Sequence, residues 1–307
     1  MNNQKLPALL APQTNWSERV TVALVRVAGY LSIVFVSLIC LFLLREGLPA
    51  LVNVPLLSLF GTTWYPIEAR FGLLPLLLGS LTVTIGAACI AVPLGIGTAV
   101  YISEIAPQWA KETLKPLVEI LAGLPSVVLG FIGILVLAPA LRRALSLNTG
   151  MTAFTGALLL AWASIPTIVS VAEDALNAVP RSYREASAAL GATRWQTIWM
   201  VTVPAARSGA LTGIMLGIGR VIGETMAVMM VTGNAPVMAF GPSALFSPVR
   251  TMTATIAAEM GEVAKGSTHY QVLFLIGIVL FVFSLVINLT VFYVGARHAA
   301  RKQRLLS

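Results

Sequence analysis

Residues 217–228, GIGRVIGETMAV, place Arg220 and Glu224 four positions apart in a long run of otherwise uncharged residues. A charge inside a membrane costs roughly 2.5–3.5 kcal/mol on insertion scales, so such residues usually face a bundle interior or a cavity and mark a pathway. The guanidinium group of Arg220 stays charged at any working pH, and its planar fork can donate two parallel hydrogen bonds to an oxyanion. Arg220 is therefore the candidate for contacting an anion.

The second charged residue offers a counter-charge. Residues four positions apart on one continuous helix lie on the same face and can form an ion pair. We expect Glu224 to hold Arg220 in place and to offset its charge, so that a passing anion is not trapped. Two alternatives stay open: a structural ion pair that fastens two spans together, and pairing of either side chain with a second subunit.

A helical wheel of this stretch separates a small, charged side from a bulky, apolar one. The small side, which includes or adjoins the two charges, carries Gly209, Gly213, Gly217, Gly219 and Gly223. The apolar side carries Leu211, Met215, Ile218, Ile222 and Met229. Glycines on one face suit either close packing against another helix or an opening to water, and both interpretations stay open.

The composition indicates where such a helix would lie. Of the 307 residues, 57% are hydrophobic and 10% are charged, and the mean hydropathy is +0.88. A soluble domain of this length would need more charge to cover its surface, so we predict an integral membrane protein in contact with lipid. The formal net charge of +8 comes mostly from short stretches between apolar segments, so we expect no binding to nucleic acid.

Six apolar stretches reach the length of about 20 residues that a helix needs to cross the hydrocarbon core. They run approximately over 21–44, 72–101, 116–138, 151–173, 208–232 and 271–295. We therefore predict an all-α membrane protein with six spans in one domain, 21–295. The flanking parts are an N-terminal segment, 1–20, and a basic tail, 296–307.

The basic residues also predict the orientation. With Arg26 and Arg220 left out because they lie within spans, the termini and the loops on their side hold twelve Lys and Arg, against six in the opposite loops. Cytoplasmic loops carry the excess of Lys and Arg, so we expect both termini in the cytoplasm. Two loops are too long to be simple connectors, namely the cytoplasmic 174–207 and the external 233–270.

The cytoplasmic loop reads DALNAVPRSYREASAALGATRWQTIWMVTVPAAR. Its composition favours a helix after Pro180 that Gly191 interrupts, and a second helical piece that stops at Pro204. This predicts a helix–turn–helix at the membrane face. An amphipathic hairpin, with arginines toward lipid headgroups and tryptophans at the boundary, is the plain alternative.

The spacing in this loop resembles the EAA signature of ABC importer permeases, which is EAA, three residues, G, nine residues, I-x-L-P. Here Glu185, Ala186 and Ser187 are followed after three residues by Gly191 and after nine more by V-x-V-P, which ends at Pro204. Ser187 and the two valines depart from the signature but are conservative in size or character. The resemblance implies that 180–204 contains a coupling helix, which docks into a groove on a cytoplasmic ATPase.

The same resemblance suggests how that helix would dock. Small side chains leave a slim helix, Gly191 permits a tight turn, and Arg181, Arg184 and Glu185 would supply polar contacts at the rim of the groove. The chain itself has no P-loop, because GEVAKGS lacks a lysine after its second glycine. We therefore expect a partner to hydrolyse ATP and this chain not to be an enzyme.

Longer strings extend the resemblance over most of the chain. LAGLPSVVLGFIGI, GRVIGETMAV and TATIAAEMGEVAKGSTHY are similar to the PstC family of phosphate-importer permeases, rather than to the sister family PstA. This implies the type I ABC importer permease fold in a bacterial inner membrane, with no cofactor. It also implies three partners: a PstA-like second permease, a PstB-like ATPase dimer and a PstS-like external phosphate-binding protein.

The sequence also fits other functions. A permease of the same type for sulfate, molybdate or another oxyanion is the first, and an ion-coupled secondary transporter or channel is the second. A membrane-embedded enzyme is weaker, because no Ser/His/Asp, HExxH or paired-carboxylate pattern occurs in the spans. The external loop is expected to be helical over about 248–264 and to act as a cap, a gate or a landing surface. His269 and His298 are isolated from any cluster of metal ligands, so no metal site is expected.

Overall fold

The computed structural model describes residues 16–238 and 241–303, which are mostly helical. Within this part, six helical stretches are long and apolar enough to cross a membrane. They are Val20–Asn53, Leu74–Ile105, Ser126–Ala144, Ala153–Asn177, Arg194–Gly223 and Thr268–Tyr293. The predicted all-α class and the number of spans are thereby confirmed.

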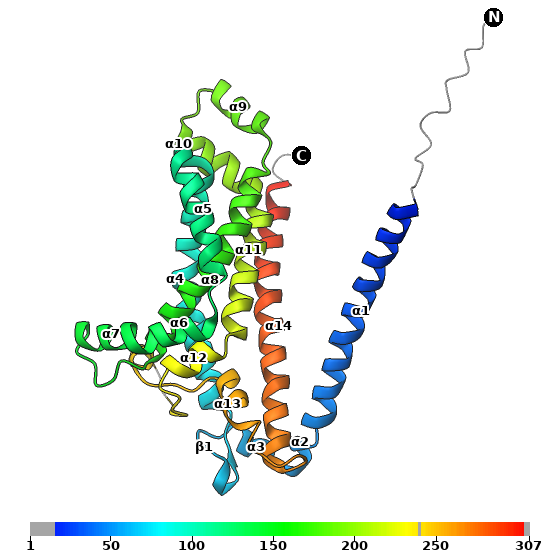
Figure 1. Cartoon of the computed structure of the whole chain (residues 1–307), viewed down its shortest axis with the longest axis vertical. Coiled ribbons are helices and arrows are strands. Elements are labelled where there is room, and N and C mark those ends of the chain that lie inside the picture. The colour runs from blue at the N-terminus through cyan, green and yellow to red at the C-terminus, as the bar shows by residue number, and fades with distance from the viewer. Residues whose placement is uncertain (1–15, 239–240, 304–307) are drawn as a thin grey trace, which may run out of the picture.

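Three helices form the centre of the bundle (Figure 1), namely α4 (Leu74–Val100), α8 (Ala153–Asn177) and α11 (Val203–Gly223). Ile168 of α8 is fully buried between Gly95 of α4 and Gly217 of α11, and a Cβ at either glycine would overlap its side chain. Glycines thus let both neighbouring helices approach α8 closely, as in other membrane bundles.

The first and last long helices form a separate pair beside this centre. α1 (Trp16–Gly47) leans away from the bundle and meets α14 (Thr268–Gln303) near one end, where the Phe42 and Phe274 rings pack edge-on with centroids 5.4 Å apart. The start of α1 and the end of α14 lie toward the same end of the molecule as α9 (Arg181–Ala189) (Figure 1). α14 continues as a helix through most of the predicted tail, and residues 1–15 and 304–307 lie outside the described part.

The third predicted span, 116–138, is not continuous, so that prediction was wrong. α5 (Gln108–Ala122) ends at Ala122, and helix resumes only after Pro125. Proline cannot donate a backbone hydrogen bond and disfavours helical geometry at the residue before it, which explains the break. The resumed helix runs sideways from the bundle in Figure 1 and consists of α6 (Ser126–Ile132), the π-helical η3 (Gly133–Leu137) and α7 (Ala138–Ala144).

The fifth predicted span, 208–232, is wrong at both ends. α11 stops at Gly223, Glu224 is extended with ψ 127°, and a short α12 (Met226–Val231) follows. At the other end the helix does not stop before Pro204, because α10 (Arg194–Thr197) runs through the π-helical η4 (Ile198–Thr202) into α11. A π turn shifts the hydrogen-bond register, so the helix accommodates Pro204 in the first turn after it.

Short elements close the end of the molecule opposite α9. They are α2 (Ala50–Asn53), α3 (Leu56–Leu59), β1 (Trp64–Tyr65), η1 (Pro66–Glu68), β2 (Arg70–Phe71), η5 (Pro242–Phe246) and α13 (Met252–Glu259). The strands pair antiparallel, with Trp64 opposite Phe71. α13 is shorter than the helix predicted over 248–264.

Glu259 at the end of α13 connects several of these elements. Its carboxylate lies 2.8 Å from both Arg250 Nη1 and His269 Nε2, and it accepts a hydrogen bond from Trp64 Nε1 at 3.1 Å. His269 is therefore paired with a single carboxylate. This contact joins the strand pair, α13 and α14 into one cap.

Candidate translocation pathway and coupling loop

Arg220 lies half-buried in the last turn of α11 and reaches two other helices. Its Nη1 donates to Thr167 Oγ1 of α8 and its Nη2 to the backbone oxygen of Ala122, both at 3.4 Å. Ala122 is the last residue of the broken helix α5, where carbonyl groups lack helical partners and carry a partial negative charge. The cation is thus placed where three helices meet at a break.

Glu224 occupies the other break and faces a helix start. Its Oε1 accepts hydrogen bonds from the backbone N–H groups of Thr225 and Ala227, at 3.1 and 3.2 Å, so it caps α12. A carboxylate is favourable at this positive helix end. Glu224 also lines a small polar cavity of about 10 Å³ with Ser80 and Thr84, large enough for about one water molecule.

The predicted pairing of Arg220 with Glu224 was wrong. Among residues 16–238 and 241–303, no ion pair joins the two side chains. The prediction assumed a continuous helix, but the helix ends at Gly223 and the extended backbone turns Glu224 toward α12. Each charge instead matches the partial charge of a different broken helix.

The glycines of α11 divide into two groups. A Cβ at Gly209, Gly213 or Gly217 would collide with or crowd α8, so these three residues serve close packing. A Cβ at Gly219 or Gly223 would meet no atom within 4 Å. Of the two interpretations of the small face, packing applies to the first group, and an open surface beside Arg220 applies to the second.

The coupling loop forms a hairpin of α9 and α10 at one end of the molecule (Figure 1). Gly191 makes the turn with φ +81°, a conformation that favours glycine. Ser187 and Thr197 join the two limbs through their hydroxyl oxygens, 3.0 Å apart. Glu185 and Ala186 are exposed on α9, whereas Pro204 is half-buried in the first turn of α11.

Arg184 bonds to residues at the ends of two spans instead of extending into solvent. Its Nη2 lies 2.6 Å from Glu104 Oε1, and it also donates to the backbone oxygens of Val179 and Leu176, at 2.7 and 3.0 Å. Glu104 belongs to the π-helical η2 (Tyr101–Ile105), which continues α4. Glu104 was not predicted as a site residue, although it is a carboxylate that closely follows the predicted span 72–101.

A second polar cluster lies between α5 and α8. Lys115 Nζ is 2.8 Å from Glu173 Oε2, and Asn177 Nδ2 donates to Glu173 Oε1 at 2.6 Å. Ser103 of η2 donates to Asn177 Oδ1 at 2.8 Å, which connects this cluster to η2. The hydrogen bond with Glu173 raises the pKa of Lys115 above its ordinary value of 10.5. These residues were also missed, and Glu173 marks the end of the fourth predicted span.

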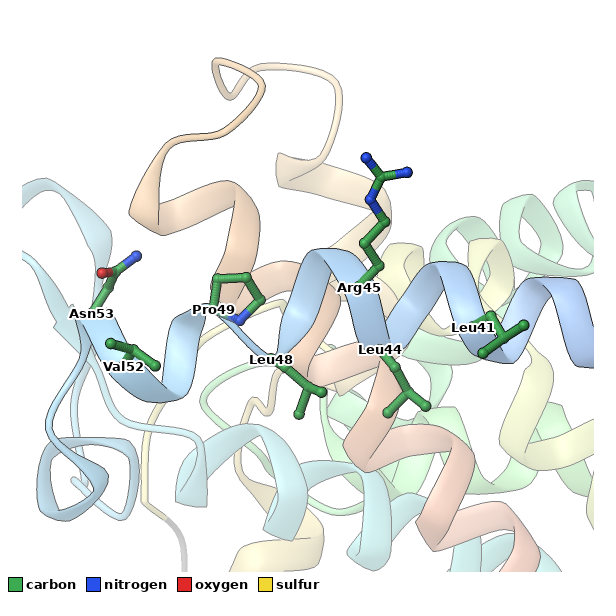
Figure 2. A pocket seen from close by; sticks show the side chains of 7 residues that line it. All are labelled: Leu41, Leu44, Arg45, Leu48, Pro49, Val52 and Asn53. Atoms are coloured by element: carbon green, nitrogen blue, oxygen red, sulfur yellow. The ribbon is translucent and has the colours of Figure 1, made fainter.

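A wide recess elsewhere does not fit a pathway. It lies at the junction of α1 and α2, with a volume of about 650 Å³, and is lined by Leu41, Leu44, Arg45, Leu48, Pro49, Val52 and Asn53 (Figure 2). Arg45 extends away from the leucines in Figure 2, and its side chain is 83% exposed. Since the lining is mostly apolar and contains none of the predicted site residues, this surface resembles a lipid-facing one.

Comparison with protein families identifies the architecture. Residues 91–301 match the family described as binding-protein-dependent transport system inner membrane component. The chain belongs to this family. It is therefore a multi-pass inner-membrane protein and a permease subunit of a binding-protein-dependent ABC importer.

Individual relatives are consistent with this assignment. The chain is 42% identical to the probable ABC transporter permease protein YqgH of Bacillus subtilis, over 84% of both chains. It is 33% identical to the phosphate transport system permease protein PstC of Mesorhizobium japonicum, over 91% of this chain and 90% of the relative. The resemblance to phosphate-importer permeases found in the sequence is thereby confirmed.

Solved structures support the fold alone. A bacterial alginate ABC transporter in complex with a periplasmic protein matches with a TM-score of 0.61 at 17% identity, covering 93% of this chain and 98% of that one. The MetNI methionine ABC transporter matches with a TM-score of 0.54 at 18% identity, over 78% and 99%. The predicted type I importer fold is confirmed.

Proposed function

We propose that this chain forms the translocation path for inorganic phosphate and that Arg220 contacts the anion in transit. The observation that carries the proposal is that no carboxylate neutralises the Arg220 guanidinium among the described residues. Its two hydrogen bonds go to neutral oxygens at 3.4 Å, and among the described residues it has no carboxylate within ion-pair distance. A guanidinium with such long contacts keeps donors for an anion.

The surroundings of Arg220 suit transient binding. Two helices break beside it, and irregular backbone inside a membrane protein is tolerated where it lines a cavity or is buried in protein. In other transporters, broken helices place their ends at the substrate. The open surface at Gly219 and Gly223 gives a passing anion space next to the cation.

Phosphate is favoured over sulfate or molybdate by the named relatives. Several relatives at 33% identity are phosphate transport system permease proteins, including PstC 1 of Mycobacterium tuberculosis. An arginine alone does not distinguish tetrahedral oxyanions, so this part of the proposal rests on similarity and needs its own test.

The exposed hairpin is the proposed docking site for a cytoplasmic ATPase. Tyr183 is 53% exposed, Leu190 is 89% exposed, and Glu185 and Ala186 lie on the same short helix. Hairpin docking requires α9 and both termini to be cytoplasmic, as the distribution of Lys and Arg predicts. The proposed complex contains this chain, a PstA-like permease, a PstB-like ATPase dimer and a PstS-like phosphate-binding protein.

Uptake by the complete complex in proteoliposomes tests the proposal. We expect ATP-driven uptake of radiolabelled phosphate that excess unlabelled phosphate suppresses and excess sulfate or molybdate does not. Arg220→Gln should lower uptake by about tenfold or more, the effect of losing a charged hydrogen-bond donor, while Arg45→Gln at the distant recess should leave it unchanged. Undiminished uptake by a normally assembled Arg220→Gln complex would refute the role of Arg220, and suppression by sulfate would refute the substrate.

A further inference from the structure

Both limbs of the coupling hairpin bond to one residue at the end of the second span, Glu104. From α9, Arg184 donates to both carboxylate oxygens, from Nη2 at 2.6 Å and from Nε at 3.4 Å. From α10, Arg194 donates to the backbone oxygen of Glu104. The Glu104 side chain is only 10% exposed, so its bonds to Arg184 are largely shielded from water.

The residue next to Glu104 is bonded to α5. Lys111 Nζ donates to the backbone oxygen of Ser103 at 2.6 Å, close to the start of α5. The opposite end of α5 is Ala122, whose carbonyl oxygen accepts from Arg220. At 1.5 Å per residue, α5 spans about 17 Å between Lys111 and Ala122. One helix thus connects the hairpin contact with the candidate anion site.

The hairpin end of this connection involves π-helical segments, whereas the connecting helix α5 is α-helical with one internal proline, Pro116. Glu104 lies in the π-helical η2, and the π-helical η4 follows the hairpin directly in the chain. Single π turns are weak points at which a helix changes register and often occur at functional sites. α5 is α-helical between its two contacts, although Pro116 within it removes one backbone hydrogen bond, so Lys111 and Ala122 belong to the same helix.

We propose that Glu104 is the positioning residue through which movement of the coupling hairpin reaches Arg220, with α5 as the connecting lever. This inference rests on the proposed function, because it requires an ATPase to move the hairpin. In this inference Arg184 holds the hairpin to Glu104 and does not contact the ATPase. Coupling is an energy shared between residues, so the test compares an exchanged charge pair with its two single variants.

The test uses the complete complex in proteoliposomes and measures phosphate transported per ATP hydrolysed. Glu104→Gln keeps the side-chain shape and removes the charge. We expect the variant complex to retain its ATPase subunit and its hydrolysis, while the ratio falls about tenfold, as for loss of one charge-assisted hydrogen bond. The exchanged pair Glu104→Arg with Arg184→Glu should recover much of the ratio. Glu112→Gln, on the exposed side of α5 where Glu112 pairs with Gln108, is the matched control and should not change it.

An unchanged ratio in Glu104→Gln, or an exchanged pair no better than its single variants, would overturn the inference. If Glu104→Gln does not assemble, Lys111→Met breaks the next contact without altering the hairpin. It should lower the same ratio, and a wild-type ratio would again overturn the inference. Failure of the proposed function looks different, because the wild-type chain would then retain no ATPase or transport no phosphate.

Discussion

Arg184 in the first turn of α9 and Arg220 in the last turn of α11 are both partly buried, yet their surroundings differ. Arg184 bonds both oxygens of a buried carboxylate and two backbone oxygens, with its shortest contact at 2.6 Å. Arg220 has two neutral partners at 3.4 Å, beyond the usual N–H···O distance of about 2.9–3.0 Å. An arginine that is neutralised inside the protein fixes structure, whereas one with long neutral contacts keeps its charge and donors for a ligand.

The largest difference is expected when each arginine is replaced by glutamine. Arg184→Gln leaves Glu104 buried without its counter-charge, which should cost about 3 kcal/mol of unfolding free energy. Arg220→Gln removes only weak neutral contacts and should cost about 1 kcal/mol or less. Thermal unfolding of the purified complexes in detergent measures both losses. Equal losses would show that Arg220 is as structural as Arg184.

The glycines beside Arg220 provide a second, smaller contrast. Gly217→Ala forces a Cβ into Ile168 and should destabilise the packing of α11 on α8 by about 1–3 kcal/mol, the usual cost of overpacking. Gly219→Ala adds the same atom where nothing lies within 4 Å, and alanine favours helix. Its unfolding midpoint should therefore stay level or rise. A fall equal to that of Gly217→Ala would mean that this surface is packed.

Glu224 distinguishes a helix cap from a counter-charge. Glu224→Gln retains the oxygen that accepts from Thr225 and Ala227, so it should lose little stability and little uptake. Glu224→Ala removes the cap and should cost about 1 kcal/mol. If Glu224 neutralised Arg220 in the working complex, the glutamine variant would instead be as defective in uptake as the alanine variant.

The smallest effect is expected at Lys115, whose side chain is 45% exposed. Because its pKa is raised in the folded state, the ion pair with Glu173 contributes fully below the ordinary pKa of 10.5 and is lost as pH rises through the raised value. Lys115→Met should lower the free energy of unfolding by less than about 1 kcal/mol, and this loss should not change with pH near neutrality. The free energies of unfolding of the variant and the wild type should become equal only in strong alkali. Equal values near neutral pH would contradict a stabilising ion pair.

The sequence predicted long regular helices well and their interruptions poorly. Apolar length is enough to locate a span such as Ala153–Asn177, because burial in lipid requires it. The break at Glu224 had no proline to indicate it. It depends on hydrogen bonds from the N–H groups of Thr225 and Ala227 and on Thr253, which donates to the Glu224 carbonyl. The break before α6 was indicated in the sequence by Pro125, but the apolar stretch around it led to the prediction of a continuous span.

The residues of the candidate site were predicted from the sequence, but the contacts between them were not. The EAA spacing predicted the position of a hairpin whose turn is at Gly191, in the left-handed conformation, because a turn depends on the residues within it. The partners of Arg220 and Arg184 are separated from them by 53 and 80 residues, at Thr167 and Glu104, and only tertiary packing brings them together. A wheel drawn on one helix could not include them.

Chemical restoration of the charge at position 220 tests the central claim most directly. Arg220→Cys would be made with Cys40 and Cys89 replaced by serine, since both are free thiols, and assembled into the complete complex. We predict that phosphate uptake is lost and is restored in part by a cationic aminoethyl methanethiosulfonate, but not by its anionic sulfonatoethyl analogue. Equal recovery with both reagents, or full uptake by the unmodified variant, would contradict the claim that a positive charge at position 220 contacts phosphate during transport.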